Sequence, residues 1–263
     1  ISACLVGSEM CIRDSYRGSF QNKFMWMPVL YLPLEMAAGV WTAAVDEPGA
    51  GKLFRRMSWG TSALGALGTF FHLVGARRQM GGLYNWRYNL MTGPPAMAPP
   101  QVALFGLLGV LGTGRRDARD RVRRLRFGNA GSLLFLALDS GSSHYQNYYR
   151  NRVQYTPLIL APALAAAEVA AEAPSPAVGR AGRRAEKVLS AAAVLAGVVG
   201  FGFHLWNVRK RAGGFSWQNL FYGAPAGAPL QLSGQGALGL LAGFFDPRAR
   251  ERSASASRSE EHD

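Results

Sequence analysis

One stretch of this chain occurs twice, and that repetition constrains the fold more than any other feature. Residues 71–99 and 203–229 both begin with Phe-His-Leu, continue through a basic pair, two glycines and a Trp, and end in Asn-Leu-x-x-Gly-x-Pro-Ala-x-Ala-Pro. In that last phrase, seven of the eleven positions are identical between the two copies. Shared composition does not produce a match in this order, so the sequence predicts two copies of one structural unit.

The repeat extends beyond this stretch in both directions. Segments 16–33 and 145–162 share two aromatic positions, an asparagine and two prolines at one constant spacing. The pattern Gly-x-Leu-Gly-x-Leu also occurs twice, at residues 106–111 and 236–241. Each copy is therefore predicted to contain a loop rich in Tyr and Asn, followed by three apolar helices.

The composition predicts that these helices lie in a membrane. Only 17% of the 263 residues are charged, against roughly 25% in soluble domains, while 49% are hydrophobic. The charges are clustered, which leaves the apolar runs expected of a protein whose loops carry the charge. The predicted fold is all-α, a polytopic membrane helix bundle in which Gly60, Gly65 and Gly68 allow helices to approach closely. The seven predicted spans are residues 25–45, 57–74, 98–112, 127–142, 155–171, 188–206 and 229–245.

The first residues are expected to be foreign to the fold. Leu5 to Ser15 reads L-V-G-S-E-M-C-I-R-D-S, which resembles the in-frame translation of a transposon-end adapter used in sequencing libraries. The predicted counterpart of the helix at 127–142 falls in this region, so we expect eight spans in the intact protein, with the first one lost. The predicted units are an adapter-like peptide at 1–15, a first repeat at 16–126, a second repeat at 127–245 and a disordered tail at 246–263.

The distribution of Lys and Arg predicts the orientation in the membrane. Four spans per repeat make the two repeats parallel, related by an axis along the membrane normal. Lys and Arg are more numerous in the loops after spans one, three and five and in the tail than on the opposite side. That richer side is predicted to be the cytoplasmic side of a bacterial inner membrane, so the repeated motif loops are extracytoplasmic. Although the net charge is +13, no basic-aromatic recognition module is present, and we expect no nucleic-acid partner.

The repeated motif loops are candidate ligand-binding elements. Irregular backbone near a membrane is tolerated where protein covers it or where it lines a wet cavity, and the Gly and Pro residues of these loops disfavour a helix. Asn89 and Asn219 can donate and accept hydrogen bonds, and Trp86 and Trp217 precede them. The loops could therefore bind a small ligand. The alternative is an interfacial hairpin whose Asn bonds its own backbone and whose Trp lies in the aromatic belt.

His72 and His204 occupy equivalent places near the outer ends of spans two and six. Two imidazoles on facing helices could ligate a haem b or contact a quinone, and histidine also relays protons. The alternative is a histidine favoured by the dipole at a helix C-terminus. His144 and Asn151 lie in a polar, aromatic loop after span four, which could add to a ligand surface or form a plain interfacial loop. A metal site is weakly supported, because few carboxylates accompany these histidines and no cysteine occurs beyond residue 15.

Three acidic residues, Glu35, Asp139 and Glu168, lie in or near the apolar spans. Ionisable residues there are costly and usually face the bundle interior or a cavity. None has a matching acid in the other repeat, which favours one-sided roles or positions nearer the interface.

Four functional interpretations remain open from the sequence. The leading one is a multi-pass membrane protein with an outward-facing, pseudo-symmetric site for a small ligand or cofactor. The alternatives are a haem- or quinone-binding redox subunit, a small-solute transporter that needs a polar path through the bilayer, and a scaffold that holds a periplasmic or membrane protein partner. No catalytic residues are predicted.

Overall fold

The chain folds into a bundle of helices, seen in a computed structural model that describes residues 20, 22–45, 47–92, 97–113, 117–146, 148–223 and 225–248. All regular secondary structure within these ranges is helical. The long helices are α2 (Trp26–Ala44), α3 (Pro48–Arg77), α5 (Ala98–Gly112), α6 (Ala118–Gln146), α7 (Thr156–Ala171), α8 (Pro176–Arg209) and α10 (Ala228–Phe245). The short elements are η1 (Lys23–Met25), α4 (Trp86–Thr92), η2 (Arg152–Tyr155) and α9 (Trp217–Tyr222).

The helices coincide with or enclose the predicted apolar spans. Helix α5 has the predicted bounds, α7 and α10 differ from them by one residue at one end, and α2 is one residue shorter at each end. Helices α3, α6 and α8 are longer, because Arg, Lys, Glu and Ala at their ends are good helix formers. Two of the loops implied by the predicted spans are largely helical. Most of the arginine-dense segment 115–126, between spans three and four, belongs to α6, and the segment between spans five and six is helical from Pro176.

The motif loops are also more helical than predicted. The first half of each motif forms a short helix, α4 or α9, before the chain reaches the Gly and Pro residues. Ser216 caps α9 by accepting a hydrogen bond from the backbone N–H of Asn219. In the second motif, residues 223 and 225–227 are not helical, as expected, whereas residues 93–96 of the first motif lie outside the described ranges.

Three helices within the described ranges are long and apolar enough to cross a membrane, namely the segments Lys23–Ala44, Arg152–Ala171 and Pro176–Arg209. Their large apolar side chains remain exposed along much of their length, for example Leu34 at 61%, Ile159 at 70% and Leu195 at 65%. Exposed apolar faces of this extent are typical of helices that contact lipid. Helix α5 is apolar but shorter. The count of seven spans remains a prediction.

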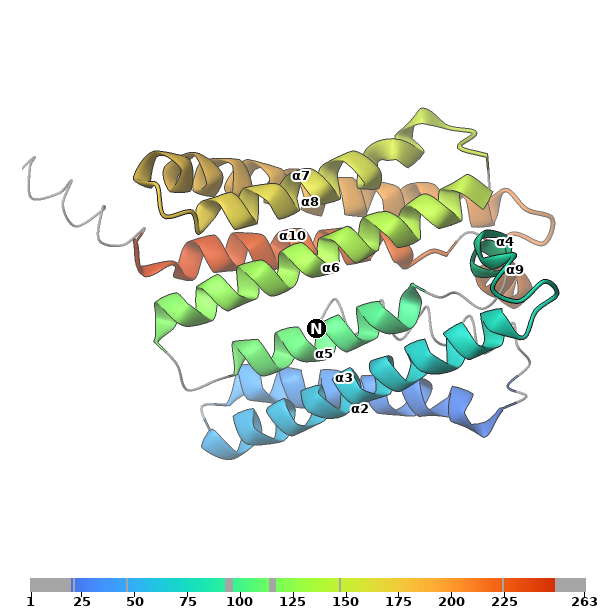
Figure 1. Cartoon of the computed structure of the whole chain (residues 1–263), viewed down its shortest axis with the longest axis horizontal. Helices are drawn as coiled ribbons and strands as arrows, with labels where there is room; N and C mark the ends of the chain where they lie inside the picture. Colours follow the sequence, from blue (N-terminus) through green and yellow to red (C-terminus); the bar gives the residue numbers. More distant parts are fainter. Residues whose placement is uncertain are drawn as a thin grey trace, which may run out of the picture.

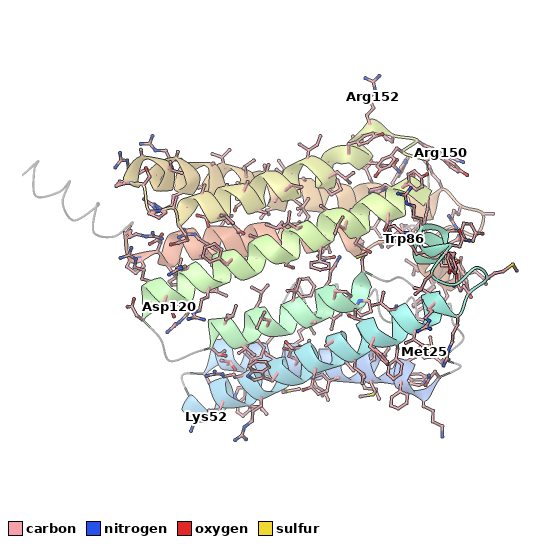
Figure 2. All side chains as sticks on the ribbon, viewed as in Figure 1. Met25, Lys52, Trp86, Asp120, Arg150 and Arg152 are labelled. Atoms are coloured by element: carbon pink, nitrogen blue, oxygen red, sulfur yellow. The ribbon has the colours of Figure 1, made fainter. Side chains whose placement is uncertain are left out.

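The long helices form two adjoining groups. Helices α2, α3 and α5 pack together, as do α6, α7, α8 and α10, and α5 lies against α6 where the groups meet (Figure 1). A small apolar core lies in the second group, around Leu133, Leu136, Leu164 and Leu232. Helices α4 and α9 lie at the same end of the bundle, and that end also carries the labelled Trp86, Arg150 and Arg152, whereas Lys52 and Asp120 lie at the opposite end (Figure 2).

Glycines allow close helix contacts in both groups. A Cβ on Gly65 of α3 would lie 2.2 Å from the backbone nitrogen of Ala103 in α5, and one on Gly197 of α8 would lie 2.2 Å from Ser233 Oγ in α10. The prediction that Gly60, Gly65 and Gly68 permit close packing is confirmed, because Gly68 meets Pro99 and Gly60 meets Tyr31 of α2.

Candidate functional site

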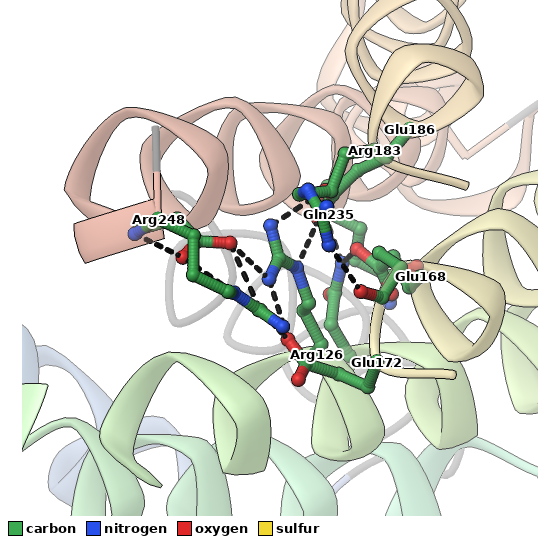
Figure 3. A network of polar contacts seen from close by, with 10 residues as sticks. Arg126, Glu168, Glu172, Arg183, Glu186, Gln235 and Arg248 are labelled. Atoms are coloured by element: carbon green, nitrogen blue, oxygen red, sulfur yellow. Dashed lines mark hydrogen bonds and ion pairs between the residues drawn. The ribbon is translucent and has the colours of Figure 1, made fainter. Parts of the chain in front are cut away.

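A buried ionic cluster joins four helices of the second helix group. Arg126 of α6 has no exposed surface and donates to three carboxylates (Figure 3). Its Nε and Nη2 each lie 2.8 Å from an oxygen of Glu186 on α8, and its Nη1 lies 2.5 Å from Glu172 Oε1 and 2.8 Å from Asp246 Oδ2. This paired geometry is the strongest that a guanidinium makes. The cluster therefore joins the ends of α6, α7, α8 and α10.

The residues after α10 complete this cluster. Arg248 donates from Nε to Asp246 Oδ1 at 2.9 Å and from Nη2 to Glu172 Oε1 at 2.5 Å. Burial would raise the pKa of Asp246, but its hydrogen bonds with Arg248 and Arg126 outweigh burial and lower that pKa to about 2. The predicted disordered tail is therefore wrong for Asp246 to Arg248, because these residues pair with buried groups; residues 249–263 lie outside the described ranges.

One turn further along α6, a second polar cluster surrounds Glu168. Asn129 Nδ2 donates to Glu168 Oε1 at 2.6 Å and to the backbone carbonyl of Gln235 at 3.1 Å. Gln235 Nε2 donates to Ser132 Oγ at 2.8 Å. All four side chains are buried. Glu168 therefore lies inside the bundle and not at its surface. An interior position is the one expected of a functional acid.

The polar contacts continue where the two helix groups meet. Gln231 of α10 donates to Gln101 Oε1 of α5, and Gln101 Nε2 donates to the carbonyl of Phe135 on α6 at 3.3 Å. These two glutamines are at equivalent positions in the repeated sequence, and both are buried. Each buried polar group in a membrane helix costs free energy to place there, so a pair of them indicates a role in function or in helix packing.

We call this arrangement the polar file, defined as Arg126, Asn129, Ser132 and the Phe135 carbonyl on α6 together with their partners on α5, α7, α8 and α10. Asp139 and His144 continue the same helix toward its other end. From Arg126 to Phe135 the helix rises about 14 Å at 1.5 Å per residue. The polar file therefore begins at one end of the bundle and follows part of α6 toward the other end.

His144 and His204 interact at the end of the bundle that carries the motif loops. Burial lowers the pKa of His144, and the nearby His204 lowers it further. His204 Nδ1 lies 2.6 Å from the carbonyl oxygen of Pro225, within the second motif loop. Tyr149 lies beside His144, with ring centroids 6.2 Å apart, and donates to the carbonyl of Gly141 at 2.9 Å. The contact with Pro225 therefore links His204 to the second motif loop, and His144 lies near His204.

His72, the other half of the predicted haem pair, is half-buried near the end of α3. The haem or quinone hypothesis, which requires His72 and His204 to face one another, remains a prediction. The histidine that His204 influences electrostatically is His144, whose pKa it lowers.

The two motif asparagines use their amide groups in the same way. Asn89 Nδ2 donates to the carbonyls of Met80 and Gly82, and Asn219 Nδ2 donates to those of Ala212 and Gly214. Each asparagine thereby closes a turn in which two consecutive glycines have positive φ, a conformation that other residues rarely adopt. This geometry favours the interpretation of an amide that bonds its own backbone.

Trp86 and Trp217, the tryptophans of the two motifs, are exposed by 54% and 64%. Trp86 and Asn89 line an open, mostly apolar hollow of about 350 Å³ together with Phe70, Leu73 and Leu83. Its lining matches a lipid chain or an aromatic belt better than a polar ligand.

The remaining predicted site residues are distributed over the molecule. Asn151 caps η2 by accepting from the Val153 N–H at 3.2 Å and is exposed. Glu35 is buried in α2 and accepts a hydrogen bond from Thr61 Oγ1 of α3. Asp139 is half-buried on α6. Of the three predicted acids, only Glu168 belongs to the polar file.

Sequence reasoning missed most of the polar file. Arg126 was assigned to a basic loop, and Asn129, Glu186, Gln101, Gln231 and Gln235 were not singled out. Two signals pointed to them: Arg126, Asn129, Leu133 and Leu136 share one face of a helix by their spacing, and Gln101 and Gln231 fall at equivalent positions of the repeat.

Comparisons with protein families, with curated proteins and with solved structures gave no match. The fold and the site together define an all-helical protein whose apolar helices are compatible with a membrane location.

Proposed function

We propose that this chain is a membrane transport protein built from two parallel repeats, and that it carries a small cation along the polar file, which lies within the second helix group and reaches the first at Gln101. The single observation that carries the proposal is the file of buried polar side chains that runs from the Arg126 cluster to the Gln101–Gln231 pair. A scaffold would need no polar groups inside its bundle. A transporter needs them, and repeat proteins bind substrates at the interface of their repeats.

Several features support the two-repeat architecture, with a first repeat in 16–126 and a second in 127–245. The order of a short 3-10 helix, two long helices, a short helix and a further helix occurs twice, from η1 to α5 and from η2 to α10. Asn89 and Asn219 make equivalent backbone contacts, and Gly65 and Gly197 occupy equivalent close contacts. Asn22 and Asn151 cap η1 and η2 in the same way.

The chemistry of the file favours a cation as the cargo. Its interior side chains are a carboxylate, amides and a hydroxyl, whose oxygen atoms can bind a cation. Arg126 closes one end, but its donors are engaged by Glu172, Glu186 and Asp246, so its charge is compensated there. An anion would find few uncompensated donors in this interior.

Transport is tested with the full chain reconstituted in liposomes. We expect radioactive sodium or rubidium, or protons reported by a trapped dye, to cross faster than in protein-free vesicles. Gln231→Leu removes the central amide and should slow the flux about tenfold, since a buried polar partner is lost. Gln218→Leu, an exposed glutamine of α9, is the matched control and should leave the flux unchanged. Flux equal to that of empty vesicles with all three probes contradicts the proposal.

The orientation is part of the same proposal: an inner-membrane location with the motif loops outside the cell and the C-terminus in the cytoplasm. The motif helices α4 and α9 share one end of the bundle, and the basic loops lie toward the other, which supports this orientation. With Cys4 and Cys11 replaced, Met80→Cys, at a position 92% exposed, should react with an impermeant maleimide in intact cells. Lys52→Cys should react only after permeabilisation. The reverse pattern contradicts the orientation.

A further inference from the structure

Three buried acceptor oxygens around Glu168 lack hydrogen-bond partners among the described residues. They are Glu168 Oε2, Asn129 Oδ1 and Gln235 Oε1, and the three side chains that carry them are between 0% and 2% exposed. The same side chains form one cluster, because Asn129 Nδ2 bridges Glu168 Oε1 and the Gln235 backbone carbonyl. A buried acceptor without a donor is costly, and three of them in one cluster indicate a missing donor.

Helix α10 packs tightly against Glu168. A Cβ added to Gly239 of α10 would lie 3.1 Å from Glu168 Oε1 and 2.3 Å from Ser190 Oγ. Ser190 Oγ also has no partner in the described part of the chain, but neither does Ser58 Oγ, its equivalent in the first repeat, and both lie against a glycine of the neighbouring helix. We therefore assign these two serines to helix packing and the other three oxygens to the site.

Within the part of the chain that the structure describes, no cation compensates the carboxylate of Glu168 directly. Arg126 of α6 donates to Glu172, Glu186 and Asp246, and Arg248, after α10, donates to Glu172 and Asp246. Arg183 of α8 donates to the carbonyl of Ala171 at 2.9 Å. The ionic cluster next to Glu168 thus contains three arginines and three carboxylates, of which Arg126 and Glu186 act on Glu168 electrostatically. The hydrogen bond that Glu168 accepts comes from a neutral amide, which stabilises a negative charge less than a guanidinium does.

We propose that Glu168, which accepts a hydrogen bond from Asn129, is a proton-binding site. This inference rests on the transport function proposed above and identifies the transported cation as a proton. A proton taken from water forms an O–H bond on a Glu168 oxygen, leaves hydroxide behind, and converts the carboxylate into a neutral acid. The new O–H supplies a donor within the three acceptors. The equivalent position in the first repeat is Gly39, so the site belongs to the second repeat alone.

Infrared difference spectroscopy of the purified full chain in detergent tests this site. Lowering the pH from about 10 to about 5 should produce the carbonyl stretch of a protonated carboxylic acid in a dry environment, distinct from the exposed acids. Glu168→Gln should abolish this band. Glu35→Gln, a buried acid of α2 that already accepts from Thr61, is the matched control and should retain it. Should Glu168→Gln fail to fold, Glu168→Asp should instead shift the band, because the carboxyl group moves.

The outcomes separate this inference from the proposed transport. If the band vanishes in Glu35→Gln and persists in Glu168→Gln, the assignment is wrong. If sodium at constant pH removes the band in the wild type, the site binds sodium and the proton assignment is overturned. A band assigned to Glu168 without any flux in liposomes supports the proton site and contradicts transport. Proton flux that Glu168→Gln leaves unchanged supports transport and overturns the role of this site.

Discussion

Replacing Arg126 with alanine is expected to destabilise the chain by about 3–5 kcal/mol, the cost of leaving buried charges without their partner. Arg126 is fully buried, and its guanidinium lies within 2.8 Å of Glu172, Glu186 and Asp246. Removing it leaves these carboxylates near one another with only Arg248 close to two of them among the described residues. The apparent melting temperature in detergent, followed by size-exclusion chromatography of heated samples, should fall sharply.

The control for this prediction lies on the same helix. Arg124 pairs with Asp120 one turn away, but both side chains are exposed, by 47% and 37%. Such a pair contributes at most about 0.5 kcal/mol, so Arg124→Ala should melt close to the wild type. Arg126→Lys should rescue little, because a lysine ammonium cannot reproduce the forked contacts of a guanidinium. Equal melting of Arg126→Ala and Arg124→Ala would show that the cluster contributes nothing to stability.

The same cluster makes the free energy of unfolding depend on pH in the acidic range. The pKa of Asp246 in the folded chain, about 2, is below its ordinary value of about 3.9. Its stabilising contribution is therefore complete above about pH 4 and is lost as the pH falls toward about 2, because the unfolded chain takes up the proton first. In Arg126→Ala this acid-dependent loss should be smaller, since Asp246 keeps only Arg248 as a partner.

Replacing Gly197 with alanine is expected to destabilise the second helix group by about 1–3 kcal/mol, the usual cost of forcing extra volume into a packed interior. The added methyl would lie 2.2 Å from Ser233 Oγ and 2.5 Å from the carbonyl oxygen of Pro229. The Pro229 carbonyl is backbone, so α8 and α10 must separate. Ser233 Oγ also donates to the carbonyl of Val194 at 2.8 Å, and that bond would be lost.

Substituting a second glycine of α8 is expected to stabilise the chain. A methyl group added to Gly202 would meet no described atom within 4 Å, so Gly202→Ala should gain up to about 1 kcal/mol from helix propensity alone. Gly65→Ala in the first repeat should behave like Gly197→Ala, because its methyl would lie 2.2 Å from the Ala103 backbone nitrogen. If both glycine substitutions in contact positions raise the melting temperature, the close packing described above is wrong.

The sequence was a good guide to the helices and a poor one to the site. The bounds of α5, α7 and α10 were predicted to within one residue, since proline at their first turn and apolar composition mark them clearly. The repeat also predicted that the two motif segments lie on one side of the bundle, and α4 and α9 do lie at the same end (Figure 1). Glu168 was recognised as a candidate because an acid inside an apolar run is conspicuous.

The ionic cluster could not be predicted in the same way. Arg126 ends a run of arginines that, as a pattern, is typical of a solvated segment facing anionic lipid. Its burial depends on Glu172, Glu186 and Asp246, which are up to 120 residues away in the sequence. Neither periodicity nor composition reports such long-range pairing. Likewise, the pairing of His204 with His144 depends on where α6 and α8 end in space.

The ionic cluster can be completed only late in the synthesis of the chain. Asp246 is synthesised 120 residues after the arginine it binds, so the guanidinium of Arg126 has its full set of partners only when the end of the last helix has left the ribosome. Until then Arg126 can pair with Glu172 and Glu186 alone. A chain shortened to end before Asp246 would lack the third carboxylate at this buried guanidinium.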